Sequence, residues 1–284
     1  MPMAGLNMAT PINPSDLRGK RGDTPKKPYR QILIDEMTEG LHAMQRSVTG
    51  LSLSGLSAGL DIGFSLFLMA AMQTLAGEYF SQPVLRMVNA NLYAVGFIFV
   101  VLGRSELFTE QTTLAVLPVL GRHASLARLG RLWAIIYVSN LVGAALFAEL
   151  TVLIGPRLQI IDVAALGEIS ATVTEHPALA ILLSAVLAGW LMGLMSWLVA
   201  ASRDTISQIV VVWLVATVIG FTQLHHAIVG SVEVLAGVFA GRATLASFGH
   251  FLLWATVGNA IGGGVFVAVL KYSHATREEP EDVG

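Results

Sequence analysis

The sequence predicts an all-α integral membrane protein with six membrane-spanning helices, of which the second and the fifth are broken. Of its 284 residues, 54% are hydrophobic and only 13% are charged, whereas a soluble domain carries about 25% charged residues. Six long apolar regions follow one another along the chain. Two of them hold polar side chains near their middle, where a simple membrane helix is apolar.

The fifth apolar region, Ser207–Ala240, is too long for one span. As a straight helix it would run about 50 Å at a rise of 1.5 Å per residue, but the hydrocarbon core of a bilayer is about 30 Å thick. Its middle holds four polar residues, Thr222, Gln223, His225 and His226. Non-helical backbone at membrane depth is tolerated where it lines a cavity or is buried in protein. We therefore predict a broken helix whose break lines a pore.

The two ends of the chain are polar. Residues 1–45 are rich in Pro, Lys and Arg and predict a cytoplasmic tail with an amphipathic helix near residues 32–45 that lies at the membrane surface. No cleavable signal peptide is predicted, because this stretch lacks a short apolar core followed by a small-residue cleavage site. Residues 46–273 are predicted to form the transmembrane channel domain, and residues 274–284 a cytoplasmic C-terminal tail.

The distribution of Lys and Arg predicts that both termini are cytoplasmic. Basic residues concentrate in the tail and in the loops on its side, and the opposite loops hold only Arg86, Arg157 and Arg242. We expect a bacterial inner (plasma) membrane protein that contacts membrane lipid. The net charge of −2 indicates no nucleic-acid partner, and the absence of Cys excludes disulfides and Cys-bound metal.

The two halves of the chain share a pattern. The second region breaks at Gly103–Gln111 and the fifth at Thr222–His226, while the third carries Asn140 and the sixth Asn259, each followed three residues later by Gly. Three spans per half would place the second half upside down relative to the first. This layout predicts a 3+3 inverted repeat, with the binding site where the broken helices meet near the midplane.

His225 and His226 are the foremost candidates for chemistry. Titratable side chains at membrane depth are costly and usually face an interior or a watery path, and histidine changes its charge near neutral pH. Neighbouring residues of a helix cannot face the same way. We expect one histidine to face the pore and the other to pack as support.

The first break offers hydroxyl donors and apolar bulk. Ser105 and Thr109 are candidates to donate to a passing anion or to satisfy freed backbone groups. Leu107 and Phe108 are candidates for an apolar constriction, together with two aromatic residues of the first span, Phe64 and Phe67.

Other polar residues are interpreted as structural support. Glu106 fits a role at a helix start better than that of a ligand for an anion it would repel. Asp61 and Arg104 lie at membrane depth and are candidates for an ion pair with each other or with a neighbouring glutamate, because an unpaired charge there is costly. Asn140 and Asn259 are the matching supports of the two halves.

One motif suggests an enzyme. Gly55-Leu-Ser-Ala-Gly59 matches the nucleophile elbow G-x-S-x-G, with Ser57 as nucleophile and His226 as base of an intramembrane serine hydrolase. The elbow requires a strand–turn–helix setting, whereas this motif lies in a Gly- and Ser-rich apolar span. No metal-ligand spacing is present, and we predict no metal and no cofactor.

Several of these residues together resemble the formate/nitrite transporter family over about Thr49–Tyr272. The resemblance rests on Glu106-Leu-Phe-Thr109, on Asn140-Leu-Val-Gly143 and on His226 after Gly220-Phe221. It implies an aquaporin-like fold, a homopentamer and one pore in each protomer. It also implies small monovalent anions such as formate, nitrite or hydrosulfide as substrates, often moved with a proton. His226 is then expected at the pore centre, facing Thr109, next to a constriction of the Leu107-Phe108 type.

The chain departs from the family pattern in ways typical of a divergent branch. His225 stands where the family usually has an acidic residue, and Glu110-Gln111 stand where it has Gly or Ser followed by Asn. No lysine around Val173–Glu175 matches the family's vestibule lysine.

The function predicted from the sequence is therefore passage of small monovalent anions or their conjugate acids, through a channel or a proton-coupled carrier. The protein is not expected to be an enzyme. Alternatives are a pore for neutral solutes such as ammonia or water, a non-transport scaffold or sensor and, more remotely, the serine hydrolase.

Overall fold

The computed structural model describes residues 26–275, and the predictions for residues 1–25 and 276–284 lie outside this range. Within it, six helices are long and apolar enough to cross a membrane. The elements are α1 Tyr29–Gln45, α2 Val48–Ala76, α3 Gln82–Gly103, α4 Phe108–Leu114, α5 Val116–Leu120, α6 Leu126–Ile154, α7 Val163–Thr174, α8 Ala178–Ala201, α9 Thr205–Thr222, α10 Ala227–Phe239, α11 Leu245–Ile261, the π-helix η2 Gly262–Val269 and α12 Leu270–Ala275.

The predicted breaks of the second and fifth spans are confirmed. Helix α3 ends at Gly103 and α4 starts at Phe108, while α9 ends at Thr222 and α10 starts at Ala227. The first residue after each helix end has a left-handed backbone conformation: Arg104, with φ 55°, follows α3, and Gln223, with φ 53°, follows α9. A left-handed residue closes a helix end by turning the chain away from the axis.

Some boundaries differ from the expectation. The apolar run of the second region begins at about Leu92. Helix α3 starts ten positions earlier, at Gln82, because Pro83 fits the first turn of a helix. Helix α7 was not predicted; the Asp162 side chain caps it by accepting from the backbone N–H of Ala164. The start of α3 and the whole of α7 lie outside the apolar regions that the sequence shows, so hydrophobicity alone does not reveal them.

Helix α1 packs against protein. Its apolar face, including Leu33 and Met37, forms a cluster with Leu117 of α5 and Trp197 of α8. The apolar face is thus buried against protein, and the position of this helix at the membrane surface stays a prediction.

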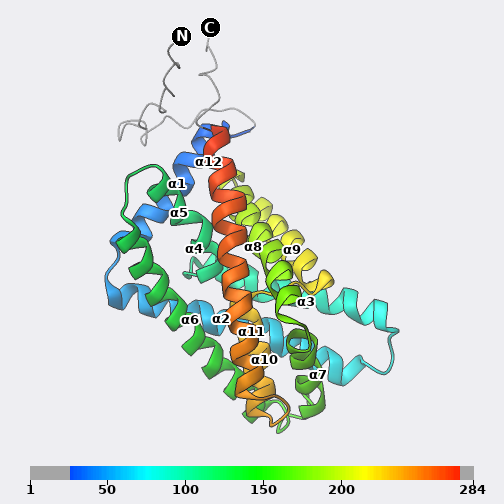
Figure 1. Cartoon of the computed structure of the whole chain (residues 1–284). Helices are drawn as coiled ribbons and strands as arrows, with labels where there is room; N and C mark the ends of the chain where they lie inside the picture. The colour runs from blue at the N-terminus through cyan, green and yellow to red at the C-terminus, as the bar shows by residue number, and fades with distance from the viewer. Residues whose placement is uncertain (1–25, 276–284) are drawn as a thin grey trace, which may run out of the picture.

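The long helices pack in pairs, two of them within a half of the chain and one across the halves. Helix α2 lies against α6, α8 against α11, and α3 against α9 (Figure 1). Glycines allow the closest approaches: a Cβ at Gly59 would overlap the carbonyl oxygen of Asn140, and a Cβ at Gly189 would overlap that of Asn259. Small residues let membrane helices pack at short range in this way.

The sixth span is not a regular helix throughout. Its middle, Gly262–Val269, is a π-helix that starts with three glycines. The wider turn brings Gly263 against α4, where the Thr113 hydroxyl donates to the Gly263 carbonyl oxygen at 3.1 Å. The irregular turn therefore joins the sixth span to the first broken helix.

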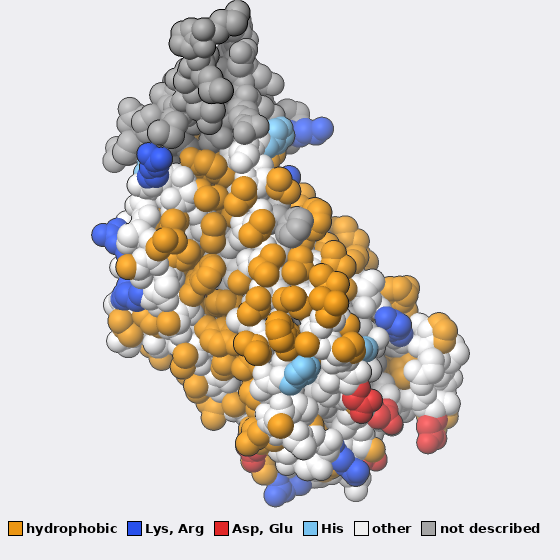
Figure 2. All heavy atoms as spheres, viewed as in Figure 1, with side chains coloured by type: hydrophobic (Ala, Val, Ile, Leu, Met, Phe, Trp, Pro, Cys, Tyr) orange, Lys and Arg blue, Asp and Glu red, His pale blue; other side chains and the backbone are white. Residues whose placement is uncertain are grey.

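The molecular surface has a broad apolar zone. Figure 2 shows hydrophobic side chains over the middle of one face and charged ones gathered toward its two ends. Exposed leucines of three different spans contribute to the apolar surface of the molecule, among them Leu146, Leu183 and Leu253. This distribution fits an integral membrane protein.

Candidate pore

Asn140 organises the first break. Its side-chain oxygen accepts from the backbone N–H of Phe108 (2.8 Å), and its Nδ2 donates to the carbonyl oxygens of Gly55 (2.8 Å) and Glu106 (2.9 Å). The side chain is fully buried. One amide therefore ties α6, α2 and the start of α4 together and satisfies backbone groups that the break leaves without helical partners.

Asn259 organises the second break in the same way. Its side-chain oxygen accepts from the N–H of Ala227 (2.8 Å), and its Nδ2 donates to the carbonyl oxygens of Ala185 (2.8 Å) and His225 (3.0 Å). Every contact has its counterpart in the first break. The two asparagines therefore have equivalent supporting contacts.

His226 and Thr109 meet between the two breaks. The Nε2 atom of His226 lies 2.8 Å from the Thr109 hydroxyl oxygen, and both residues are at most 1% exposed. The Nδ1 atom of His226 accepts from the backbone N–H of Val229 at 3.2 Å, which makes His226 the N-cap of α10. An acceptor Nδ1 leaves the proton of the neutral ring on Nε2, which therefore donates to Thr109.

Apolar side chains enclose this pair. Leu107 is fully buried and Phe108 is 4% exposed. The Phe97 ring stands edge-on to the His226 ring with centroids 5.2 Å apart, and the Phe108 ring packs edge-on against Tyr137. An imidazole–hydroxyl hydrogen bond with apolar neighbours is an arrangement that can screen passing solutes for size and charge.

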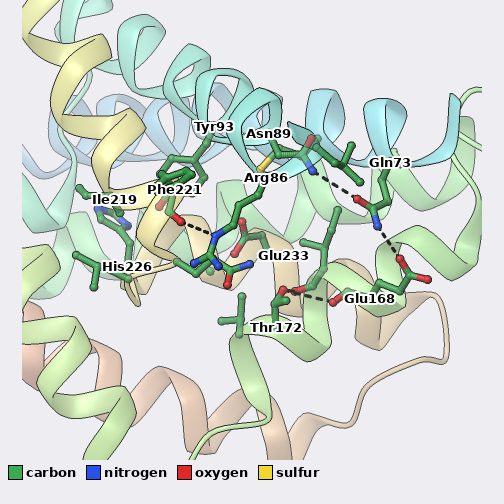
Figure 3. A pocket seen from close by; sticks show the side chains of 18 of the residues that line it. Gln73, Arg86, Asn89, Tyr93, Glu168, Thr172, Ile219, Phe221, His226 and Glu233 are labelled. Atoms are coloured by element: carbon green, nitrogen blue, oxygen red, sulfur yellow. Dashed lines mark hydrogen bonds between the residues drawn. The ribbon is translucent and has the colours of Figure 1, made fainter. Parts of the chain in front are cut away.

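Two cavities lie on opposite sides of this narrow region. The distal cavity, about 740 Å³, is lined by residues of α2, α3, α7, α9 and α10, including Arg86, Tyr93, His226 and Glu233 (Figure 3). The proximal cavity, about 210 Å³, lies on the side of α1 and is lined by Glu36, Glu106 and Glu110 among others. No described residue lines both cavities: His226 borders the distal one, and Glu110, the neighbour of Thr109, borders the proximal one.

The proximal cavity has a buried carboxyl group supplied by α1. Both oxygens of Glu36 accept from the Ser196 hydroxyl, at 2.8 and 3.0 Å, and the residue is 2% exposed. Burial raises the pKa of Glu36 to about 8, because removal from water disfavours the charged form. At neutral pH Glu36 is therefore mainly protonated.

His225 turns away from Thr109. Its Nε2 lies 3.1 Å from the carbonyl oxygen of Val173, and its Nδ1 lies 2.9 Å from the Ser184 hydroxyl. These contacts join the second break to α7 and α8. The ring also borders the distal cavity.

The charged residues of the first break do not pair as expected. Asp61 accepts from the hydroxyls of Ser57 (3.1 Å) and Ser105 (3.3 Å) and forms no ion pair with Arg104. Glu106 pairs with Arg46 instead, at 2.8 Å. The hypothesis of an Asp61–Arg104 pair is therefore wrong: Arg104 is at the exposed end of α3, where it lines the proximal cavity.

The two aromatic residues predicted from α2 differ in position. Phe64 is 41% exposed and its ring contacts Phe99 and Phe147. Phe67 is half-buried against the core cluster that contains Leu107 and Phe108, and its place at the constriction stays a prediction. Phe97 stands beside His226, and nothing in the sequence distinguishes it within an apolar span.

Sequence reasoning also missed Arg86 and Glu233, which both line the distal cavity (Figure 3). Arg86 was assigned to a loop because the start of α3 was placed too late. Glu233 is the only acidic residue of the apolar run that follows His226. An ionisable side chain within such a run is itself a signal of function, and it was available from the sequence.

The chain is similar to proteins of one family. The family model described as "Formate/nitrite transporter" matches residues 31–273. The "Inner membrane protein YfdC" of Escherichia coli is 30% identical over 91% of this chain and 83% of its own length. The "Nitrite transporter NirC" of Salmonella typhimurium is 28% identical over 80% of this chain and 83% of its own length.

Solved structures have the same fold. An "FNT family ion channel" superposes with a TM-score of 0.77 at 21% identity, covering 86% of this chain and 98% of the other. A "Pentameric formate channel with formate bound" superposes with a TM-score of 0.65 at 21% identity, covering 80% and 97%.

Proposed function

Because the chain belongs to the formate/nitrite transporter family, we propose that it moves small monovalent anions across the membrane as their neutral conjugate acids. The arrangement that carries this proposal is the His226–Thr109 hydrogen bond, enclosed by apolar residues between two cavities that each hold charged side chains. The chain is a membrane transport protein and not an enzyme. The serine hydrolase alternative is wrong: Ser57 lies within α2, and its hydroxyl donates to Asp61.

Desolvation favours passage of the neutral acid. Moving a small ion from water into a low-dielectric medium costs on the order of 20 kcal/mol in the Born limit. A hydrogen bond to a charged group returns only about 1.5–3 kcal/mol. Two donors, His226 and Thr109, therefore do not offset the cost for a bare anion, whereas they suffice to guide a neutral acid.

The role of His226 in this proposal is to donate a hydrogen bond. Its Nδ1 is occupied by the N–H of Val229, so a second proton on the ring would break the cap of α10. Its Nε2–H is free to turn from Thr109 to a solute oxygen. The hydroxyl hydrogen of Thr109 has no acceptor among the described residues and is available to the same solute.

Uptake into proteoliposomes tests this function. Formate, nitrite, hydrosulfide, acetate and ammonia are offered at two pH values to wild-type protein and to His226→Ala, His226→Asn and Thr109→Val. Wild type is expected to take up the anions faster at the lower external pH. In each variant this flux is expected to be at least about tenfold slower, because a lost hydrogen bond of about 1.4 kcal/mol corresponds to a tenfold change in rate.

Two controls separate chemistry from folding. Thr109→Ser keeps the hydroxyl and is expected to retain flux, and His226→Asn keeps a side chain that caps helices. Ammonia flux without anion flux in wild type would replace this function by the neutral-solute pore. Unchanged anion flux in both His226→Ala and Thr109→Val would remove the pair from the pathway.

We also propose a homopentamer. A pentameric formate channel has this fold, and α2 carries the half-buried Asp61 within a predicted span, where contact with lipid would cost about 2.5–3.5 kcal/mol. A second copy covering this face would remove that cost. Light scattering of the detergent-solubilised protein is expected to give five chains, and a monomer would contradict this assembly.

The proposed orientation places both termini in the cytoplasm of a bacterial inner membrane. The chain has no Cys, so single-cysteine variants report one position each. In intact cells an impermeant thiol reagent is expected to label Arg157→Cys and not Arg122→Cys, and the reverse pattern would invert the topology.

A further inference from the structure

Glu233 is a buried carboxyl group without a partner. It lies on α10, is 7% exposed and makes no hydrogen bond or ion pair with any described residue. Buried charges in proteins are normally paired or hydrogen-bonded, because isolation from water is costly. Glu233 lines the distal cavity, so its carboxyl group is positioned to interact with solutes that enter this cavity.

The cavity that Glu233 lines leads to His226. His226, Gly230 and Glu233 follow one another at helical spacing and all line the distal cavity. Seven residues of helix separate Glu233 from His226, a rise of about 10 Å. Because Gly230 between them also lines it, the cavity extends along α10 from the carboxyl group to the narrow region (Figure 3).

The other charged or titratable groups of this cavity are few: Arg86, Tyr93, Glu168, His225 and His226. Helix α2 contributes only residues that do not titrate, and α4, α6 and α11 contribute no lining residue. Glu168 lies exposed and accepts from Gln73 Nε2 at 2.7 Å, and His225 is held by α7 and α8. Glu233 is thus the one unengaged acid of the described cavity lining.

Arg86 provides the opposite charge in the same cavity. Its Nε donates to the carbonyl oxygen of Phe221 at 2.6 Å, one of the orphan carbonyls at the end of α9, and its guanidinium lies 5.5 Å from the centre of the Phe221 ring. The remaining N–H groups of Arg86 make no bond to described residues. A fixed cation therefore attracts anions into a space that also holds an acid.

We propose that Glu233 is the group that protonates the transported anion in the distal cavity. This inference rests on the proposed function and names the substrate class: small weak acids with a singly charged conjugate base. The O–H bond of the Glu233 carboxyl breaks as an O–H or S–H bond forms on the anion. The neutral acid passes Thr109, and Glu233 regains a proton from water in the cavity. One proton moves with each anion.

The experiment measures formate uptake and internal pH in proteoliposomes reconstituted with full-length wild type, Glu233→Gln and Glu168→Gln. Glu168→Gln is the matched control, because it makes the same change in the same cavity at a hydrogen-bonded, exposed position. Wild type and Glu168→Gln are expected to acidify the lumen with formate entry. Glu233→Gln is expected to lose about tenfold of the proton-linked flux at neutral pH.

A second measurement follows the proton itself. Infrared difference spectra of wild type between acid and alkaline pH are expected to show a carboxyl C=O band that is absent in Glu233→Gln and retained in Glu168→Gln. If Glu233→Gln does not fold, Glu233→Asp provides the test: it is expected to retain one proton per formate at a lower rate.

The outcomes are separable. Wild type that transports no small anion overturns the proposed function. Wild type that carries a proton with formate while Glu233→Gln does so at an equal rate overturns the role of Glu233 alone. A Glu233→Asp protein that moves formate at the wild-type rate without a proton would also overturn the role of Glu233.

Discussion

The two breaks share one scaffold and differ in what they place at the helix start. Asn140 and Asn259 each bind one N–H and two carbonyl oxygens, at distances that agree within about 0.1 Å. The N-cap of α4 is Leu107, which forms no side-chain cap, while that of α10 is His226, which does. The support is therefore common to both halves, and the chemistry resides in the residues that differ.

The contacts that join each break to its surroundings also differ, being charged at the first break and uncharged at the second. The first break is joined to the α1–α2 corner by the Arg46–Glu106 ion pair, and the second to α7 and α8 by uncharged contacts of His225. Buried Glu36 on the proximal side has a donor, Ser196, whereas Glu233 on the distal side has none among the described residues. A carboxyl group with a partner stabilises structure, and one without a partner is available for a solute.

Removing either asparagine is expected to have the largest effect on stability. Each change, Asn140→Ala or Asn259→Ala, leaves two backbone groups of its break without partners, one N–H and one carbonyl oxygen, at about 1–3 kcal/mol each. We expect each to cost several kcal/mol, seen as a lower thermal midpoint in detergent and a lower yield of folded protein. Asn91→Ala is the control, because Asn91 is bonded at an exposed site. If the free energies of unfolding lost in Asn140→Ala and in Asn259→Ala differ by more than about 2 kcal/mol, the two breaks are not equivalent.

Replacing the glycines at two of the close helix contacts is expected to have the next largest effect. Gly59→Ala and Gly189→Ala each place a methyl group on a backbone carbonyl oxygen, and overpacking of this kind costs about 1–3 kcal/mol. Gly130→Ala is the matched control, since nothing lies within 4 Å of a Cβ there, and it is expected to stabilise α6 slightly. Thermal unfolding with the three variants in parallel checks this; equal stability of all three would show that the contacts relax freely.

The sequence predicted the parts that depend on hydrophobicity and on local breakers. Spans such as Val48–Ala76 and Ala178–Ala201 follow from apolar composition, and the breaks follow from polar residues within long apolar runs. The contact between His226 and Thr109 was expected from the family resemblance and is present in the structure. The 3+3 inverted repeat stays a prediction that the equivalent asparagine contacts support.

What sequence did not provide is the direction in which side chains point. Phe64 and Phe97 are both phenylalanines within apolar spans, yet Phe64 is exposed and Phe97 stands against His226. Asp61 was an obvious candidate to pair with Arg104, but Ser57, one turn earlier on α2, and Ser105 of the break bind it instead. Such choices depend on helix rotation and on contacts between distant segments.

The remaining expected effect depends on pH and concerns the buried acid of the proximal side. The pKa of Glu36 rises from 4.5 to about 8 on burial. Its contribution to folding is therefore fully present below pH 4.5 and is lost as the pH rises through about 8. Between pH 6 and pH 8 wild type is expected to lose about 2–3 kcal/mol that Glu36→Gln retains, because Gln still accepts from Ser196 without ionising.

Thermal midpoints of wild type and Glu36→Gln at pH 6, 7 and 8 measure this difference. The two proteins are expected to converge at the lowest pH and to separate as it rises, with Glu36→Gln the more stable. Asp35→Asn, at a half-exposed neighbouring position in the Lys27 ion pair, is the control and is expected to change stability by less than about 1 kcal/mol. Parallel pH profiles for wild type and Glu36→Gln would mean that Glu36 is ionised or hydrated in the folded protein. The partnered acid of the proximal side would then be open to solutes, as the distal Glu233 is, and the contrast between the two sides would no longer hold.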